Sequence, residues 1–214
     1  MNWFLVSKKE IFNYLGQLRI YSIVDLIFLL VALSLSPSVF AGILCLHLGF
    51  VLYLEHRHQH NYRLPFPSFL WIGLIILGIL LYAKVEVIGF IFASYFYTQK
   101  KGSSLTLFAP FFRGFQVFFL VAGVVGYTHL LSGLALSTTF VRNALGDLRD
   151  VEKDKKEQLR TFPIMMGMKR SIPHIHLVGI LLTTTLWWSF TNLSLLFLSV
   201  ALILEIITYS LTPR

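Results

Sequence analysis

Four oxygen-bearing side chains recur at helical spacing in the most charged part of the chain. The intervals are four, three and four positions for the set Asn143, Asp147, Asp150 and Asp154. This spacing places all four on one stripe if the segment is a continuous helix. Like charges at such intervals repel by about 0.2–0.5 kcal/mol per pair, and by more when partly desolvated. We therefore expect a cation here, and oxygen ligands favour Mg²⁺, which characteristically bridges to a phosphate.

Basic residues follow the stripe and would neutralise the remaining charge of a polyanion. They are Lys153, Lys155, Lys156 and Arg160. The alternative is a solvated helix face held by ion pairs, for which Glu152 and Lys156 stand at i and i+4. Three aspartates and an asparagine on a single stripe favour the ligand-binding interpretation.

Two further pairs of polar residues lie in or beside apolar segments. Tyr97 and Lys101 are four apart in "YTQKK", on the membrane side expected for the aspartate stripe. Arg113 and Gln116 are three apart, hence on one helix face, where a polar cavity could open. The alternative for Arg113 is a side chain that snorkels to the lipid headgroups. For the remaining intramembrane acids, Asp25 and Glu205, we favour interhelical hydrogen bonds.

The elements that position these residues are predicted from composition. With 56% hydrophobic and only 13% charged residues in 214, the chain is typical of a polytopic membrane protein. We predict an all-α bundle of about eight transmembrane helices. The apolar runs lie at about 20–35, 38–54, 68–82, 85–97, 104–124, 126–146, 172–190 and 192–211.

The loops between these runs predict an orientation. The even-numbered connections carry most of the Lys and Arg residues, whereas the odd ones carry Lys84 alone, so the N-terminus and the motif loops are expected in the cytoplasm. Residues 1–19 are interpreted as an interfacial amphipathic helix lying on the membrane lipid, and 20–214 as a single transmembrane helical domain. Because the basic residues are distributed over short loops, the net charge of +8 does not indicate nucleic-acid binding.

"NALGDLRDVEKDKKEQLRTFPIMMG", residues 143–167, resembles the second aspartate-rich motif of the UbiA superfamily of intramembrane prenyltransferases. Asp150 and Asp154 match its DxxxD core, and Asp147 matches the polar residue ahead of it. The basic segment, Arg160, Thr161 and Gly167 match the tail. "YTQKK" resembles the YxxxK element of the family through Tyr97 and Lys101.

The resemblance implies a helix bundle around a lateral apolar cavity. Mg²⁺ and a prenyl diphosphate would lie at its cytoplasmic mouth, and the isoprenoid would be transferred to a lipophilic or phosphorylated acceptor. In this interpretation the catalytic set is Tyr97, Lys101, Asp150 and Asp154, and the metal ligands are Asp147, Asp150 and Asp154. The expected substrate-binding residues are Arg57, Arg63, Arg113, Asn143, Lys155, Lys156 and Arg160.

The sequence departs from the family at the first aspartate-rich motif, where "HLGFVLYLEHRHQHNYRLPFP" contains Glu55 as its single acid. The histidines of this loop would favour zinc over Mg²⁺ if they bound a metal, and the alternative is a merely polar loop. Arginine can replace a metal beside a phosphate because its planar fork pairs bidentately with the oxygens. We therefore expect a hybrid site with Arg57 or Arg63 on this side, and a minor role for Glu55.

Two functions of different classes follow. The first is a compact prenyltransferase that relies mostly on the second motif. The second is a non-catalytic lipid- or partner-binding membrane scaffold with a decayed first metal motif. The retained aspartates, Lys101 and Arg160 favour the enzyme. A transporter is disfavoured because the acids cluster at one surface instead of following a route through the bilayer.

Overall fold

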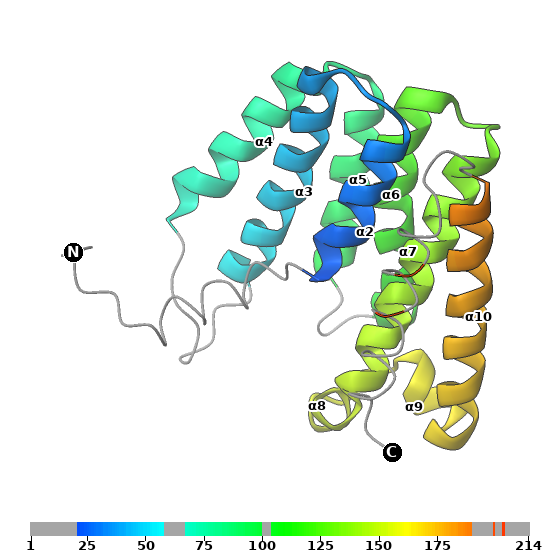
Figure 1. Ribbon diagram of the computed structural model, residues 1–214. Coiled ribbons are helices and arrows are strands. Elements are labelled where there is room, and N and C mark those ends of the chain that lie inside the picture. The colour runs from blue at the N-terminus through cyan, green and yellow to red at the C-terminus, as the bar shows by residue number, and fades with distance from the viewer. Residues whose placement is uncertain (1–20, 58–66, 100–103, 190–198, 200–202, 204–214) are drawn as a thin grey trace, which may run out of the picture. The chain divides into compact units, whose positions relative to one another are not determined.

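The computed structural model describes residues 21–57, 67–99, 104–189, 199 and 203. In this part of the chain every regular element is a helix (Figure 1). The elements are α2 (Tyr21–Ala32), α3 (Pro37–Arg57), α4 (Ser68–Tyr82), α5 (Glu86–Thr98), the 3₁₀ helix η2 (Ser104–Phe108), α6 (Ala109–Val125), α7 (Leu130–Arg149), α8 (Val151–Lys156), α9 (Phe162–Met166) and α10 (Met168–Trp188).

The apolar runs of the sequence coincide with these helices. The first five runs correspond to α2, α3, α4, α5 and η2 with α6, so the prediction of an all-α chain is confirmed for the described residues. The run at 192–211 lies largely outside the described residues, and the interfacial helix expected at 1–19 lies entirely outside them. These two elements remain predictions.

Helices α7 and α10 begin at other residues than predicted, because glycines with positive φ precede them. The run at 126–146 starts with a turn, because Gly126 has a φ of 99° and His129 caps α7 by accepting from the backbone N–H of Leu131 (3.2 Å). The run at 172–190 belongs to a helix that already begins at Met168, directly after Gly167, whose φ is 82°. Positive φ is a conformation that glycine adopts without steric cost, which explains both boundaries.

The described chain divides into two compact units, Met1–Lys84 and Val85–Arg214. In the N-terminal unit, α3 and α4 pack antiparallel through glycines. A Cβ added at Gly78 would lie 2.7 Å from Leu46 Cγ, and one at Gly42 would lie 2.6 Å from the backbone nitrogen of Tyr82. Such backbone approach is typical of helix pairs in membranes, where small residues allow close packing. Tyr53 and Trp71 add a ring contact with centroids 4.9 Å apart.

In the C-terminal unit, α6 packs antiparallel against both α5 and α7 (Figure 1). A Cβ at Gly114 of α6 would lie 2.7 Å from the carbonyl oxygen of Leu136 in α7. Phe96 of α5 stacks on Phe112 of α6, with centroids 5.3 Å apart. On its other side, α7 packs against α10. The unit is therefore a layered helix bundle with α7 in its interior.

Two segments, Pro37–Arg57 and Leu105–Val125, are long and apolar enough to cross a membrane. Large apolar side chains are also exposed on other helices, including Leu80 of α4 (71% exposed) and Leu181 of α10 (58%). Exposed apolar faces of this kind mark surfaces that meet lipid or another apolar partner. These observations agree with a membrane environment, and the eight-span arrangement remains a prediction.

Candidate functional site

Helix α7 presents two chemically different faces. Val141, Leu145 and Leu148 form a buried cluster on which residues of α10, among them Ile172 and Ile175, pack. The opposite face is polar in its second half and bears Asn143 and Asp147. This face lies toward α5 and α6, because Asn143 contacts α5 and Leu136 contacts α6. The periodicity of the helix thus separates a packing face from a polar one.

A hydrogen bond joins the two motifs that are 46 residues apart in the sequence. The hydroxyl of Tyr97, in the last turn of α5, donates to Oδ1 of Asn143 on α7 over 3.0 Å. The side-chain nitrogen Nδ2 of Asn143 is buried and makes no hydrogen bond. The structure therefore brings Tyr97 together with the first residue of the aspartate-rich segment, as the resemblance implies. Lys101, the second member of the pair, lies outside the described residues.

A chain of buried hydrogen bonds links α6 to α5 close to this contact. Arg113 Nη1 donates to Gln116 Oε1 (2.6 Å), and Gln116 Nε2 donates to Ser94 Oγ (2.7 Å). Ser94 Oγ in turn donates to the carbonyl oxygen of Phe90 (2.7 Å). Arg113 is only 9% exposed, so its side chain points along the helix to Gln116 and does not snorkel. Of the two alternatives for Arg113, the structure favours the buried polar one.

The aspartate stripe does not lie on one continuous helix, which corrects the prediction. Helix α7 ends at Arg149, and Asp150 is its C-cap with φ −91° and ψ 8°. The short helix α8 follows in a different direction (Figure 1). Backbone hydrogen bonds still run from Asp150 N–H to the Gly146 carbonyl (3.0 Å) and from Asp154 N–H to the Asp150 carbonyl (2.9 Å). The chain changes direction at Asp150, between the end of α7 and the start of α8, so the four side chains do not lie on one helix.

Asp147 and Asp154 are both buried, each with 4% of its surface exposed, whereas Asp150 is partly exposed. Burial of a carboxylate is costly unless charge or hydrogen bonds compensate it. Among the described residues, no group of three His, Cys, Asp or Glu side chains is placed to hold a metal ion. The three-aspartate site is therefore not preformed by protein ligands alone.

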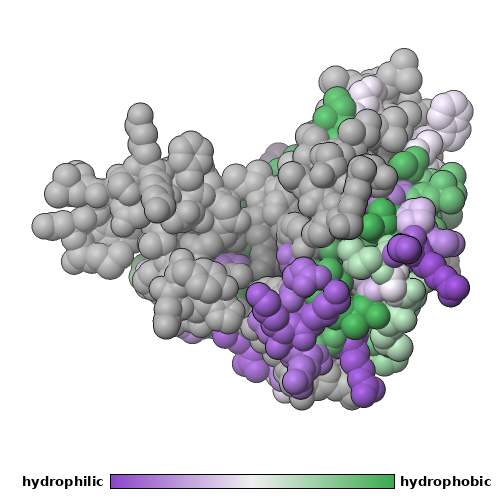
Figure 2. Space-filling view, turned by 90° about the horizontal axis from the view of Figure 1, so that it is seen from below, coloured by the Kyte–Doolittle hydropathy of each residue, from purple (hydrophilic) through white to green (hydrophobic). Residues whose placement is uncertain are grey.

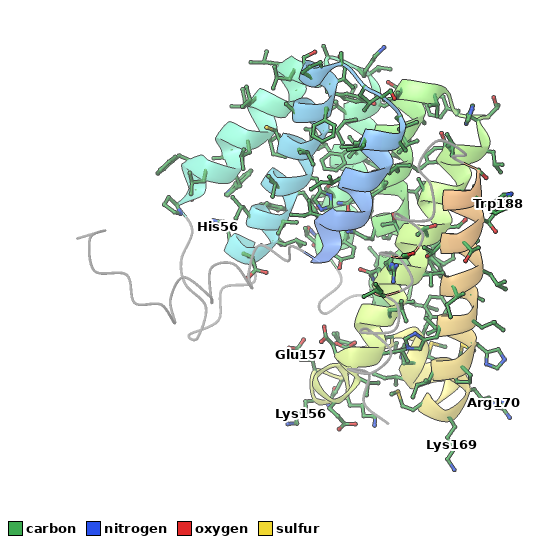
Figure 3. All side chains as sticks on the ribbon, in the orientation of Figure 1. His56, Lys156, Glu157, Lys169, Arg170 and Trp188 are labelled. Atoms are coloured by element: carbon green, nitrogen blue, oxygen red, sulfur yellow. The ribbon has the colours of Figure 1, made fainter. Side chains whose placement is uncertain are left out.

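Exposed basic residues surround this end of the C-terminal unit. Lys156 of α8 and Lys169 and Arg170 at the start of α10 project outward (Figure 3). Figure 2 shows hydrophilic side chains gathered beside apolar ones in a view from below. Lys155 forms an ion pair with Glu152 (3.0 Å, i and i+3), in place of the Glu152–Lys156 pair that the sequence suggested. Arg160 is also exposed, so the basic residues are accessible to an anion.

The segment after α8 folds back on the bundle and buries Thr161. Gln158 turns the chain with a φ of 54°, and Leu159 N–H donates to the carbonyl of Asp154 (2.9 Å). Thr161 then has no exposed surface, and its hydroxyl makes no hydrogen bond. The next residue, Phe162, completes an aromatic cluster with Phe111 of α6 and Phe140 of α7, with ring centroids 4.5–6.5 Å apart. The three pairs are Phe111–Phe140, Phe140–Phe162 and Phe111–Phe162.

The other predicted site residues lie in the N-terminal unit or outside the described part. Arg57 is exposed in the last turn of α3. Glu55, two positions earlier, is buried with 3% of its surface exposed. Arg63 falls in 58–66, which the structure does not describe, and Glu205 lies beyond the described residues as well. The proposed roles of Arg57 and Arg63 therefore remain predictions.

Sequence reasoning missed Ser94, which lies three residues before Tyr97 on α5. The spacing places both on one face of the helix, and this face makes hydrogen bonds to α6 through Ser94 and to α7 through Tyr97. A small polar residue one turn before the YxxxK element was the available signal. It was weak because serine is common in apolar helices, where it bonds to a preceding carbonyl.

The opposite end of the C-terminal unit carries a separate polar pair. Tyr127, in the turn between α6 and α7, is hydrogen-bonded to Glu86 at the start of α5. Desolvation, followed by this hydrogen bond and the negative charge of Glu86, raises the pKa of Tyr127 above its ordinary value. The phenol therefore stays neutral. It belongs to the end of the bundle away from Tyr97, at the far terminus of α5.

The site as a whole combines buried carboxylates, a buried amide donor and accessible cations beside an aromatic cluster. Carboxylate oxygens can share a hard divalent cation with a phosphate, while Lys and Arg side chains pair with the phosphate oxygens. The apolar residues next to them would accommodate a hydrocarbon group. The arrangement is thus suited to an amphipathic polyanion.

Comparison with known proteins gives one match. Residues 128–212 match the family model described as VviA prenyltransferase. The matched segment is less than half of the chain and includes α7 to α10, hence the whole aspartate-rich motif. The match supports a prenyltransferase and agrees in reaction class with the resemblance to the UbiA superfamily. No curated protein and no solved structure matches the chain.

Proposed function

We propose that this protein is an intramembrane prenyltransferase of the UbiA type, which moves an isoprenoid chain from a prenyl diphosphate to an acceptor with the help of Mg²⁺. One observation carries the proposal. The segment that matches a prenyltransferase family is the segment that bears Asn143, Asp147 and Asp154, and Tyr97 of the YxxxK-like element is hydrogen-bonded to it. Two motifs that separately resemble one family are thus in contact in the fold.

The donor set fits Mg²⁺ in the way this ion is usually bound beside phosphates. Mg²⁺ is typically held by one or two carboxylates and completed by water and substrate phosphates, so a preformed cage of three protein ligands is not required. Asp147 is a buried carboxylate one turn after Asn143 on α7, Asp154 is a buried carboxylate on α8, and Asp150 lies between them in the sequence. These three residues would hold the ion, which when bound neutralises the charge that develops on the leaving diphosphate.

The residues of the chain itself have three tasks in this reaction. The bond between C1 of the prenyl group and the diphosphate oxygen breaks, and its electron pair leaves with the diphosphate. Lys155, Lys156 and Arg160 are exposed near the aspartates and would stabilise that charge. C1 then bonds to the acceptor, which loses a proton. The cluster of Phe111, Phe140 and Phe162 would exclude water from the allylic cation.

In this proposal the protein crosses the membrane several times, and its motif loops lie in the cytoplasm. The two ends of α10 lie at opposite membrane interfaces. Helix α10 has 21 residues, which correspond to about 30 Å, the thickness of the hydrocarbon core. Its first turn contains Lys169 and Arg170 and its last residue is Trp188 (Figure 3). Basic residues at the cytoplasmic end and tryptophan at an interface are the expected anchors.

Cysteine labelling tests this orientation. Cys45 is the single cysteine in the sequence, so a Cys45→Ala background can carry Lys156→Cys or Ser189→Cys, both at exposed positions. In intact cells, a reagent that cannot cross the membrane should modify the cysteine at position 189 but not that at 156. Labelling at 156 from outside, or equal labelling at both positions, would contradict the orientation.

Binding of the donor tests the site. We expect that Asp150→Asn combined with Asp154→Asn abolishes Mg²⁺-dependent binding of farnesyl diphosphate by the purified full chain, because the amides keep the size of the side chains but remove the charge. Glu152→Gln is the matched control, since Glu152 is an exposed acid in the same segment. Undiminished binding in the double variant would contradict the assignment of Asp150 and Asp154 to the Mg²⁺ and diphosphate site, and it would favour the non-catalytic scaffold.

A further inference from the structure

The contact between Tyr97 and Asn143 determines which way the amide of Asn143 is turned. A side-chain amide has two different ends, an oxygen that accepts and a nitrogen that donates. The Tyr97 hydroxyl is 3.0 Å from Oδ1 and donates to it. The oxygen end is therefore directed at α5, and the nitrogen, which lies in the same plane on the other side of the Cβ–Cγ axis, is directed away from the Tyr97 hydroxyl.

The nitrogen end of this amide lacks an acceptor. Nδ2 of Asn143 is buried and makes no hydrogen bond, although Asp147 stands one turn further along α7, at a distance in sequence that often allows an Asn–Asp contact. Buried donors are nearly always satisfied, so an exception needs an explanation. Asn143 lies on the polar face of α7, one turn before the buried residue Asp147. A ligand that supplies an acceptor oxygen at this position would satisfy it.

We infer that Asn143 donates a hydrogen bond through Nδ2 to an oxygen of the bound diphosphate, and that Tyr97 is a positioning residue that fixes the amide in this orientation. The inference rests on the proposed function and refines it. It is consistent with a metal-ligand set that contains the aspartates and not Asn143, because Oδ1 of Asn143 accepts from Tyr97. It also changes the role of Tyr97, which the sequence placed in the catalytic set, to one exerted through Asn143.

Binding of inorganic pyrophosphate, measured by titration calorimetry on the full chain in detergent with saturating Mg²⁺, tests the inference. Asn143→Asp keeps the shape and still accepts from Tyr97, but it loses the donor and adds a negative charge. We expect it to weaken binding by about 100-fold or more, and Asn143→Ala by about tenfold, the usual loss for one hydrogen bond to a charged group. A magnesium ligand at this position would instead make Asn143→Asp bind as well as the parent or better.

Tyr97→Phe separates positioning from direct contact. Alone, it should weaken pyrophosphate binding about threefold to tenfold, because the amide is then free to turn. In an Asn143→Ala background the same substitution should have no further effect, since Tyr97 acts through Asn143. Tyr95→Phe is the matched control, because Tyr95 lies on the same helix and is 55% exposed. It should leave binding unchanged.

Each outcome decides between the inference and its premise. If the parent chain does not bind pyrophosphate with Mg²⁺, the proposed function and the inference fail together. If the parent binds but Tyr97→Phe binds equally well, or if the effects of the two residues are additive, the inference alone is overturned. Circular dichroism and size-exclusion chromatography establish that each variant is folded. Should Asn143→Asp not fold, the Tyr97→Phe comparison still decides, because the phenyl ring retains its packing.

Discussion

The α3–α4 pair of the N-terminal unit and the α5–α6–α7 group of the C-terminal unit are both built from apolar antiparallel helices, but different contacts characterise them. Glycines allow α3 and α4 to approach closely. Among the glycines of α4, Gly78 has the closest neighbour, which is Leu46 of α3. The α5–α6–α7 group also has a close glycine contact, at Gly114, and adds hydrogen bonds between side chains of different helices.

The contacts of the first region only pack the helices together, whereas those of the second region also orient polar side chains. Close glycine packing fixes the distance between two helices through van der Waals contact. Hydrogen bonds such as those of Gln116 with Ser94 and Tyr97 with Asn143 additionally fix the direction of a polar group. We therefore expect substitutions at the glycine contacts of the first region to change stability alone, and those at the hydrogen-bonded residues of the second to change stability, ligand binding or both.

The largest effect on stability is expected at Gly78. Gly78→Ala would place a Cβ 2.7 Å from Leu46 Cγ and 2.9 Å from the backbone nitrogen of Leu46, and such overpacking costs about 1–3 kcal/mol. Gly73→Ala, in the same helix with no atom within 4 Å of the added Cβ, should be neutral or stabilising by up to about 1 kcal/mol. Unfolding in mixed micelles of dodecyl maltoside and sodium dodecyl sulfate measures both. Equal effects of the two substitutions would show that the glycine contact is unimportant.

A loss of comparable size is expected at Gln116, which is fully buried. Gln116→Leu keeps much of the volume but removes the acceptor of Arg113 and the donor to Ser94, which should cost about 1–3 kcal/mol. Ser137→Ala is the control, because the Ser137 hydroxyl is exposed and bonds only within α7. The same unfolding assay applies. A Gln116→Leu variant as stable as the parent would mean that the hydrogen bonds of Gln116 contribute nothing to the packing of α5 on α6.

Much of the fold could be predicted from the sequence, because each helix depends on a local run of apolar residues. The bend at Asp150 could not, since "DLRDVEKDKK" has no residue that stops a helix. After the bend the chain returns to the bundle, where Phe162 contacts Phe111 and Phe140, two residues that are distant from it in the sequence. Tertiary packing thus overrides a local preference for a continuous helix.

The candidate site was predicted in part. The sequence identified Tyr97 and Asn143 and placed both motifs on the same side of the membrane, whereas the hydrogen bond between the two side chains required the structure. It did not identify the partner of Gln116, because Ser94 is a small polar residue on another helix. Which end of the Asn143 amide is available to a ligand also required the structure, because a sequence contains no information about the orientation of an amide.

A moderate effect on function is expected at Arg57, in the last turn of α3, but not at Glu55 two positions earlier. Arg57→Ala should raise the KM for the donor about tenfold if Arg57 pairs with the diphosphate. Glu55→Gln should preserve turnover of the folded protein while lowering its stability, because Glu55 is buried. Steady-state kinetics with one prenyl diphosphate compare the two. A large loss of turnover only in Glu55→Gln would indicate a second metal ion instead of an arginine.

The smallest effect on stability is expected at the exposed pair Lys155 and Glu152, whose side chains are 53% and 72% exposed. An exposed ion pair contributes about 0–1 kcal/mol, so Lys155→Ala and Lys156→Ala should unfold almost as the parent does. If both lysines attract the diphosphate, each substitution should raise the KM of the donor, and the increase should diminish as salt screens the charges. A KM independent of salt in the parent would contradict this role.

Formation of a prenylated product tests the central claim most directly. Membranes containing the full chain are incubated with Mg²⁺ and a deuterium-labelled prenyl diphosphate, together with aromatic, haem, chlorophyll-precursor, sugar-phosphate or glycerol-phosphate acceptors, and the lipids are analysed by mass spectrometry. We expect a labelled product, with one pyrophosphate released per transfer, for the parent and for Glu152→Gln. The product should be absent for Asp150→Asn combined with Asp154→Asn. Absence of a labelled product from the parent with every acceptor, or equal formation by the double variant, would contradict prenyl transfer at this site.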